Sequence, residues 1–322
     1  SYPQIDNNTE GIILDRAQLT APADTLCYSY SKHKSLWEYY MPMTVPGDSA
    51  TLPAVSAVSV VILSKTFNPE KFQALLTLLA GQYVKTGDPI RILGSYLSVF
   101  TTKQVKVDDE SWSASAYNDK QALLAGCSLT SFISLFGVHS VLVYNAMVLK
   151  KRVVVVADSM EALLPMVRVL PQLVWSRQNW QILRPFVTLA EAEIADLESS
   201  GVYVAGLLDG SVRSREDLFD VLVDVSAREV TIAEHSKDDF RMGDLHKEVA
   251  TFMVQGAESD DVADDVLIKG IFQRTNKCLE LVKELAAADP TLSTETMEAR
   301  NVPASTQRFM YNLAIAEGVI SR

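Results

Sequence analysis

The apolar run from Val141 to Ala157 changes its pattern part-way along and predicts a buried helix followed by a buried strand. Its first half places Leu142, Ala146 and Leu149 at helical intervals, and its second half contains the four consecutive valines Val153–Val156. β-branched side chains favour extended backbone, and an apolar run without alternation suits a strand that is covered on both faces. We therefore expect Val153–Val156 to be a central strand of a parallel sheet flanked by helices.

Three basic residues, Lys150, Lys151 and Arg152, separate the helical part of this run from the valines. Cations near the C-terminus of a helix interact favourably with its dipole and can bond its last carbonyl groups. A structural role at the helix end therefore explains the triplet, and contact with a partner is the alternative.

Upstream of this run, the pattern predicts a small β-meander. Strand-like segments lie at residues 24–31, 36–45 and 55–64. A turn at 32–35 joins the first two as a hairpin, and Pro42 indicates a strand edge or a bulge in the second.

Two helices follow the meander. Asn68 and Pro69 are typical of a helix start and Gly87 of its end, and a second helical pattern runs from Ile90 to about Thr102. Residues 106–119 are polar and rich in Ser, Ala and acids, which is typical of a loop or flexible linker.

Beyond Lys120, helical and strand-like patterns alternate. Helices are predicted at 121–136 and 160–175, where Pro165 indicates a late start or a kink. Further strands are predicted at 181–188, 202–208, 220–225 and 229–232. Strands that alternate with helices indicate a mostly parallel sheet between helical layers.

After His235 the chain is helical to its end. Patterns run over residues 242–255, 262–288 and 303–320. Asp260, Asp261, Asp264 and Asp265 lie near the start of the middle helix, where acids complement the helix dipole; a metal site is the alternative. The predicted fold is α/β, divided into a β-meander with helices at 1–105, a linker at 106–119, a helix-covered sheet at 120–235 and a helical module at 236–322.

Composition excludes several classes of protein. The chain has 322 residues, a net charge of −11 and a pI near 4.9, without the basic stripe that nucleic-acid binding needs. Cys27, Cys127 and Cys278 form no CxxC pair and are expected to be reduced thiols of a cytosolic protein. No apolar stretch is expected to reach the ~18 residues of a membrane span.

Catalytic and cofactor motifs are missing from the sequence. It contains no GxxxxGK[ST] loop, no GxGxxG after a strand, no GxSxG elbow and no HExxH. The four histidines show no spacing that would place two on one face. We therefore expect no nucleotide cofactor, metal or catalytic residue. Trp175 and Trp180 are expected to pack in or near the core, with recognition of a partner as the alternative.

The order of motifs in the middle third resembles the central module of the DENN family. AMVLKKRVVVVA is followed by VLPQLVW, by QNWQILRPFV with Trp180, and by GVYVAGLLD and DVLVDVSAREVTI. In the resemblance, Trp180 matches the family tryptophan, Tyr203–Leu207 a PYLIGV-like strand and Asp224 an acid of the next strand. The upstream part is similar to the longin-like DENN module and the tail to the helical downstream module. The resemblance implies that Ser1-Tyr2-Pro3 ends the second longin strand and that upstream residues are missing from a truncated chain.

The resemblance implies a function as well as a fold. DENN proteins are guanine-nucleotide exchange factors for Rab GTPases, so exchange in late endosomal traffic, by a peripheral cytoplasmic protein, is the first expectation. A cleft between the longin-like and central modules would grip the switch regions of the GTPase, with no catalytic residue of its own.

A second expectation is a non-catalytic adaptor. FNPEK, VLKKRVVVV, LVWSRQNW and GDLHKE resemble one branch of the DENN family, which implies association with coiled-coil subunits of the Commander endosomal recycling complex. The candidate partner-binding residues are Tyr2, Lys150, Lys151, Arg152 and Trp180. For Tyr2, a place in the longin core is the alternative.

Overall fold

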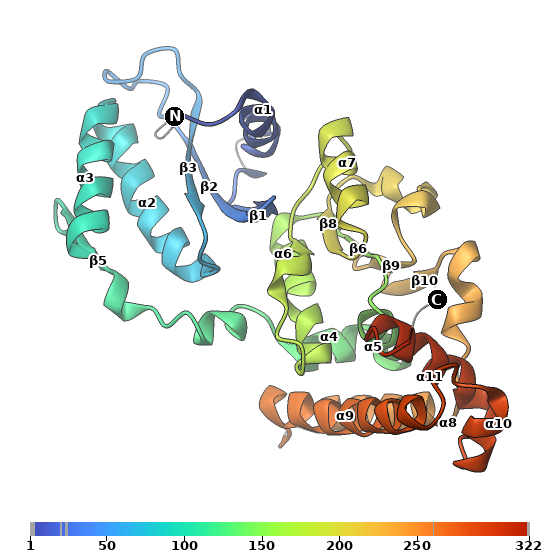
Figure 1. Ribbon diagram of the computed structural model, residues 1–322. Coiled ribbons are helices and arrows are strands. Elements are labelled where there is room, and N and C mark those ends of the chain that lie inside the picture. The colour runs from blue at the N-terminus through green and yellow to red at the C-terminus, as the bar shows by residue number, and fades with distance from the viewer. Residues whose placement is uncertain (1–3, 20, 23–24, 260, 321–322) are drawn as a thin grey trace. The chain divides into compact units, whose positions relative to one another are not determined.

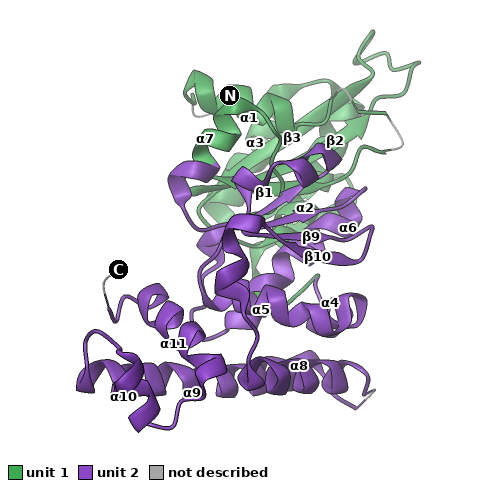
Figure 2. Cartoon of the chain, turned by 90° about the vertical axis from the view of Figure 1, so that its right-hand side faces the viewer, with its two compact units in different colours: residues 1–126, 184–196 green, residues 127–183, 197–322 purple. Residues whose placement is uncertain are grey.

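The computed structural model describes residues 4–19, 21–22, 25–259 and 261–320 (Figure 1). The chain divides into two compact units, coloured green and purple in Figure 2. Unit 1 comprises residues 1–126 and 184–196, and unit 2 comprises residues 127–183 and 197–322. The segment 184–196 therefore folds with residues that lie far from it in sequence. The boundaries at 105, 119 and 235 stay a prediction.

The sheet of unit 1 is the expected meander. Its strands are β1 (Ser29–His33), β2 (Leu36–Thr44) and β3 (Ala57–Ser64), paired antiparallel in the order β1-β2-β3. Pro42 lies in the central strand rather than in an edge strand. Pairing with β1 ends at Tyr40, so at Pro42 strand β2 pairs with β3 alone, and a residue without an N–H group is tolerated there.

Three helices accompany this sheet: α1 (Asn7–Arg16), α2 (Pro69–Thr86) and α3 (Pro89–Thr102). The start and end of α2 are as the sequence predicts. The Asn68 side chain accepts the backbone N–H of Lys71 at 3.1 Å, and Gly87 ends the helix at a φ of +61°, which favours glycine. The buried face of α2 packs on the sheet, where Phe72 stacks on Tyr39 with ring centroids 4.3 Å apart.

A β-hairpin occupies most of the segment predicted as a linker. Strands β4 (Gln104–Val107) and β5 (Glu110–Ser113) pair antiparallel, with Asp108 at a φ of +54° in the turn. The expectation of a loop at 106–119 is wrong for this hairpin, because only two of its three apolar residues are buried and they give a weak strand pattern. Val105 and Trp112 lie opposite each other in the register, and both are buried.

A fully buried ion cluster lies inside unit 1. Arg16 at the end of α1 contacts Glu38 of β2 at 2.8 Å and Glu193 of α7 (Glu191–Ser200) at 2.5 Å. All three residues are 1% exposed. The Tyr40 hydroxyl donates a hydrogen bond to Glu38, and the Thr188 hydroxyl donates one to Glu193 at 3.0 Å. This cluster holds the segment 184–196 within the unit.

The sheet of unit 2 has its four valines at the centre. β6 (Val153–Val156) pairs in parallel with β8 (Val204–Leu207) on one side and with β9 (Val221–Asp224) on the other. The full order is β10-β9-β6-β8-β7, with β7 at Leu183–Arg184 and an antiparallel β10 at Glu229–Ile232. None of the valines is more than 1% exposed. The prediction of a central, doubly covered strand is confirmed.

The helices of this sheet differ in detail from the prediction. They are α4 (Leu129–Phe136), α5 (Ser140–Val148) and α6 (Met160–Val169); α5 packs against β6, β9 and β10, and α6 against β6 and β8. Helix α6 begins at Met160, as predicted, and contains Pro165. It ends at Val169 instead of residue 175, because Pro171 has no backbone N–H to donate to the carbonyl one turn earlier. The strand expected at 181–188 shrinks to β7, since Pro185 directly follows it.

Residues 121–136 do not form one helix as predicted. They contain a 3₁₀ turn at Gln121–Leu123 and then α4, which begins only at Leu129. From there, Leu129–Val148 is a helical stretch of 20 residues that is apolar enough to cross a membrane by length and composition alone. The expectation that no segment reaches this length is wrong, because α4, the 3₁₀ turn Gly137–His139 and α5 follow one another directly in the chain. In its most apolar window, 61% is buried inside the structure.

The tail contains α8 (Asp244–Ala257), α9 (Asp264–Ala288), α10 (Thr294–Ala299) and α11 (Ala304–Ala316); α10 was not expected. Asp264 does more than begin α9. Its carboxylate accepts the backbone N–H groups of Leu129 and Thr130, each at 2.8 Å, and so caps α4. No group of residues that could hold a metal is present among the described residues; Asp260 lies outside them.

Candidate functional site

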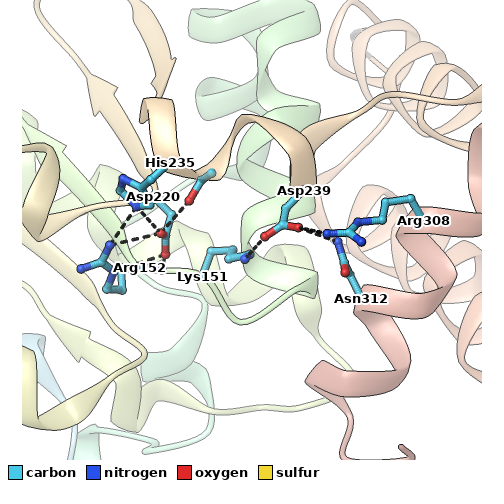
Figure 3. Close-up of polar contacts among 8 residues, drawn as sticks. Lys151, Arg152, Asp220, His235, Asp239, Arg308 and Asn312 are labelled. Atoms are coloured by element: carbon cyan, nitrogen blue, oxygen red, sulfur yellow. Dashed lines mark hydrogen bonds and ion pairs between the residues drawn. The ribbon is translucent and has the colours of Figure 1, made fainter. Parts of the chain in front are cut away.

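The basic turn, residues Lys150, Lys151 and Arg152, connects α5 to β6. Lys150 has a φ of +53°, which reverses the chain direction after the helix. Each of the three side chains reaches a different part of unit 2, as Figure 3 shows for Lys151 and Arg152. Their side chains are 38%, 16% and 25% exposed, so Lys150 is the most accessible of the three.

Arg152 is held by Asp220, which directly precedes β9. The Asp220 carboxylate accepts the backbone N–H of Arg152 at 2.8 Å and its guanidinium at 3.2 and 3.3 Å. It also contacts the Ser236 hydroxyl at 2.8 Å and Nε2 of His235 at 3.0 Å (Figure 3). Burial alone would raise the pKa of Asp220, but these hydrogen bonds outweigh it and hold the pKa well below its usual range. The carboxylate is therefore a fixed anion.

Lys151 joins the turn to the C-terminal helix through Asp239. The Lys151 ammonium lies 2.5 Å from the Asp239 carboxylate, which also accepts from Asn312 at 2.9 Å and from Arg308 at 3.4 Å (Figure 3). Burial would raise the pKa of Asp239, and the hydrogen bond and charge of Lys151 lower it further than burial raises it. One carboxylate thus binds groups from the turn and from α11.

The expected capping of α5 is carried out by another residue. Arg177 donates to the carbonyl oxygens of Met147 and Val148, both at 2.6 Å, and pairs with Glu317. Lys150 donates to the carbonyl of Ala316. The expectation that the triplet bonds the last carbonyls of α5 is therefore wrong: Arg177 makes those bonds, and the side chains of Lys150, Lys151 and Arg152 bond other parts of unit 2. A partner-binding role for the triplet stays a prediction.

Trp180 lies in the interior. It is 4% exposed and meets Trp175 edge to face, with ring centroids 5.6 Å apart. A side chain this buried presents little area to another protein, so packing explains its position, and its contact with a partner stays a prediction. Tyr2 lies outside the described residues.

A second surface, which sequence reasoning missed, lies on unit 1. We call it the α1–α3 groove: an apolar depression of about 610 Å³ bordered by α1, β3 and α3. Leu97 and Phe100 line it and are 43% and 69% exposed. The spacing of Leu93, Leu97 and Phe100 along α3 is the signal that could have revealed it, because residues at such intervals share one helix face. Apolar surface of this kind is typical of interaction sites.

Comparisons with known proteins identify the family. The chain is 34% identical over 337 residues to DENN domain-containing protein 10 of Dictyostelium discoideum, covering 99% of this chain and 92% of the relative. It is 36% identical to the Danio rerio protein of that name, covering 99% and 92%, and 33% identical to the Homo sapiens protein, covering 99% and 91%. The chain belongs to the DENN domain-containing protein 10 family. The resemblance inferred from the order of motifs is thereby confirmed.

A family model gives a second match, which is confined to unit 2 and part of unit 1. A family described as "SPA: Stabilization of polarity axis" matches residues 127–234. In this DENN protein that range contains the basic turn, Trp180 and every strand of the unit 2 sheet. The α1–α3 groove and the contacts of Asp239 with α11 lie outside it.

Proposed function

We propose that this chain regulates Rab-family GTPases by accelerating the release of bound guanine nucleotide, as a peripheral cytoplasmic protein of late endosomes. The observation that carries the proposal is the relationship to DENN domain-containing protein 10 over 99% of the chain. The motif order around β6, which resembles the module that DENN proteins use on Rab GTPases, supports it.

Exchange of this kind needs no acid, base or nucleophile. The exchange factor binds the nucleotide-free conformation of the GTPase more tightly than the loaded one and thereby raises its population. Moving such an equilibrium from 1:99 to 99:1 takes a preference of roughly 10⁴-fold, or about 5.5 kcal/mol. Contact surface supplies that preference. Lys150, the most exposed cation of the basic turn, is our candidate for one contact.

Release of fluorescent GDP from a panel of purified Rab GTPases tests the proposal. We expect micromolar chain to accelerate release from at least one Rab, and Lys150→Ala to slow the accelerated release. Lys247→Ala is the matched control, because Lys247 is an exposed lysine of the same unit that pairs with Asp244 on its own helix. Absence of acceleration across the panel removes the exchange proposal; equal effects of the two variants remove the role of Lys150.

The second candidate function is a non-catalytic adaptor that binds coiled-coil subunits of the Commander complex. The α1–α3 groove favours this candidate, because an amphipathic helix can place its apolar face in such a depression. Glu10 is the only charged residue among the described residues that line the groove, so burial of apolar area would supply most of the affinity.

Co-purification with recombinant Commander coiled-coil subunits tests the adaptor function. We expect Leu97→Asp and Phe100→Asp to abolish binding. Ile90→Asp is the matched control, because Ile90 is 78% exposed on the same helix but does not line the groove. Binding that survives the first two variants, or that is lost equally in the third, contradicts this use of the groove. Stable binding without exchange on any Rab would favour the adaptor over the exchange factor.

A further inference from the structure

A second depression of unit 1 differs in chemistry from the α1–α3 groove. It lies between α2 and the β4–β5 hairpin and encloses about 600 Å³. Helix α2 forms one wall from Glu70 to Leu78, and all four residues of β5 together with Tyr117 form the other. Successive side chains of a strand point to opposite faces of its sheet. A depression that is lined by four consecutive residues of β5 therefore runs along the edge of this strand and not over one face. We call it the β5 groove.

The strand that borders this groove has an open side. Within the part of the chain that the structure describes, β5 pairs with β4 only, from Gln104 opposite Ser113 to Val107 opposite Glu110. An edge strand presents backbone donors and acceptors to any extended chain that lies beside it. Trp112 fixes β5 in place, because its ring is 6% exposed and its indole N–H donates to the Lys71 carbonyl at 3.2 Å. The edge is therefore preorganised.

The charge of the groove has one sign. Glu70 and Glu110 are its charged lining residues, and no lysine, arginine or histidine of the described residues lines it. Glu110 is exposed and makes no ion pair among the described residues. Tyr117, half-buried, stacks on Trp112 with ring centroids 6.0 Å apart and offers an aromatic face at the same place. Carboxylates beside an aromatic ring suit a lysine or arginine side chain.

We propose that the β5 groove binds an extended, basic segment of a partner protein, which adds to β5 as a third strand. Backbone hydrogen bonds to β5 hold the segment, and the side chains at every second position point toward α2. Lysine or arginine at those positions meets Glu70, Glu110 and Tyr117. This proposal is independent of exchange on Rab GTPases and of the α1–α3 groove, and it concerns a segment that the sequence alone suggests to be a linker.

Fluorescence polarisation with a labelled eight-residue peptide of alternating lysine and threonine tests the proposal. We expect saturable binding to the full chain, and no binding of the glutamate–threonine counterpart at the same concentration. Glu110→Lys replaces an attraction by a repulsion and should weaken binding about fivefold or more. The matched control is Asp109→Lys, which changes the net charge equally one residue away but does not line the groove; it should weaken binding less than about twofold.

Equal weakening by the two variants would show diffuse attraction to an acidic protein and would overturn the proposal. So would equal affinity for the two peptides. Hydrogen exchange adds a second measurement: the amides of Glu110–Ser113 should gain protection when the lysine peptide is bound. A peptide methylated on alternate backbone nitrogens should lose both binding and protection. Binding that persists after methylation would refute strand addition.

Discussion

Replacing Arg16 by methionine tests whether the buried ion cluster stabilises unit 1. The substitution keeps much of the side-chain volume but removes the positive charge between Glu38 and Glu193. Both carboxylates are 1% exposed, so neither can be solvated without opening the structure. Removing one partner of a buried ion pair costs ~3–5 kcal/mol, because the remaining charge is left uncompensated. Here two charges remain, so we expect the upper part of that range.

Thermal unfolding followed by circular dichroism, together with urea titration, measures this loss. For a domain of this size, each kcal/mol lowers Tm by roughly 3 °C, so Arg16→Met should lower the transition of unit 1 by roughly 10–15 °C. The control is Arg91→Met, since Arg91 pairs with Asp88 at the surface and is 66% exposed; such pairs contribute ~0–1 kcal/mol.

A combined variant separates charge from shape. Arg16→Met with Glu38→Gln and Glu193→Gln removes all three charges and should recover more than half of the lost stability, since a neutral buried set has no ion to desolvate. If Arg16→Met alone stays within about 1 kcal/mol of the wild type, the cluster does not stabilise the unit in the way we describe. No recovery in the triple variant would show that packing, and not charge, accounts for the loss.

Three further predictions concern unit 2. Asp264→Ala leaves two backbone N–H groups of α4 without their acceptor and should lower the free energy of unfolding, measured by urea titration, by ~1–3 kcal/mol. The control is Asp265→Ala, because Asp265 is exposed in the same turn; it should lower this free energy by less than ~0.5 kcal/mol. Equal losses in the two variants would contradict the capping role. Burial raises the pKa of Cys278 to about 11, so its thiol should not react with iodoacetamide in the native protein at pH 8. Mass spectrometry should find Cys278 unmodified and the half-buried Cys27 modified. Equal rates of modification at the two cysteines would refute this prediction. Burial lowers the pKa of His246 from 6.5 to about 4, so the unfolded chain binds the proton first. The free energy of unfolding should therefore fall between pH 6.5 and 4, by about 2–3 kcal/mol at pH 4.5. His246→Gln should remove most of that fall in urea midpoints compared at pH 7.5 and 4.5, and an unchanged fall would exclude His246 as its source.

Elements defined by local signals could be predicted from the sequence. The four consecutive valines of β6 have apolar side chains on both faces of the strand, so both faces must be buried. Asn68, Pro69 and Gly87 fix the ends of α2 through their own backbone and side-chain chemistry. The hairpin at 104–113 was not predictable in this way. It depends on the fit of Trp112 against α2, and three apolar residues among serines and acids leave too weak a pattern.

Contacts between distant residues were beyond the reach of the sequence pattern. Arg16 and Glu193 are 177 positions apart, and Asp264 and Leu129 are 135 apart. Nothing in either local sequence distinguishes these residues from ordinary surface charges. The same holds at the candidate site. The basic turn could be located from its three cations, but Asp220 and Asp239, which bind two of them, could be found only in the folded chain.

The discontinuity of unit 1 affects how the protein can be dissected. A fragment that stops at Gly126 contains the meander and its helices but lacks residues 184–196, so it would expose Arg16 and Glu38 without their third partner. Expression of the two halves as separate polypeptides should therefore yield an unstable first piece. A workable minimal fragment would need the later segment grafted back through an engineered connection.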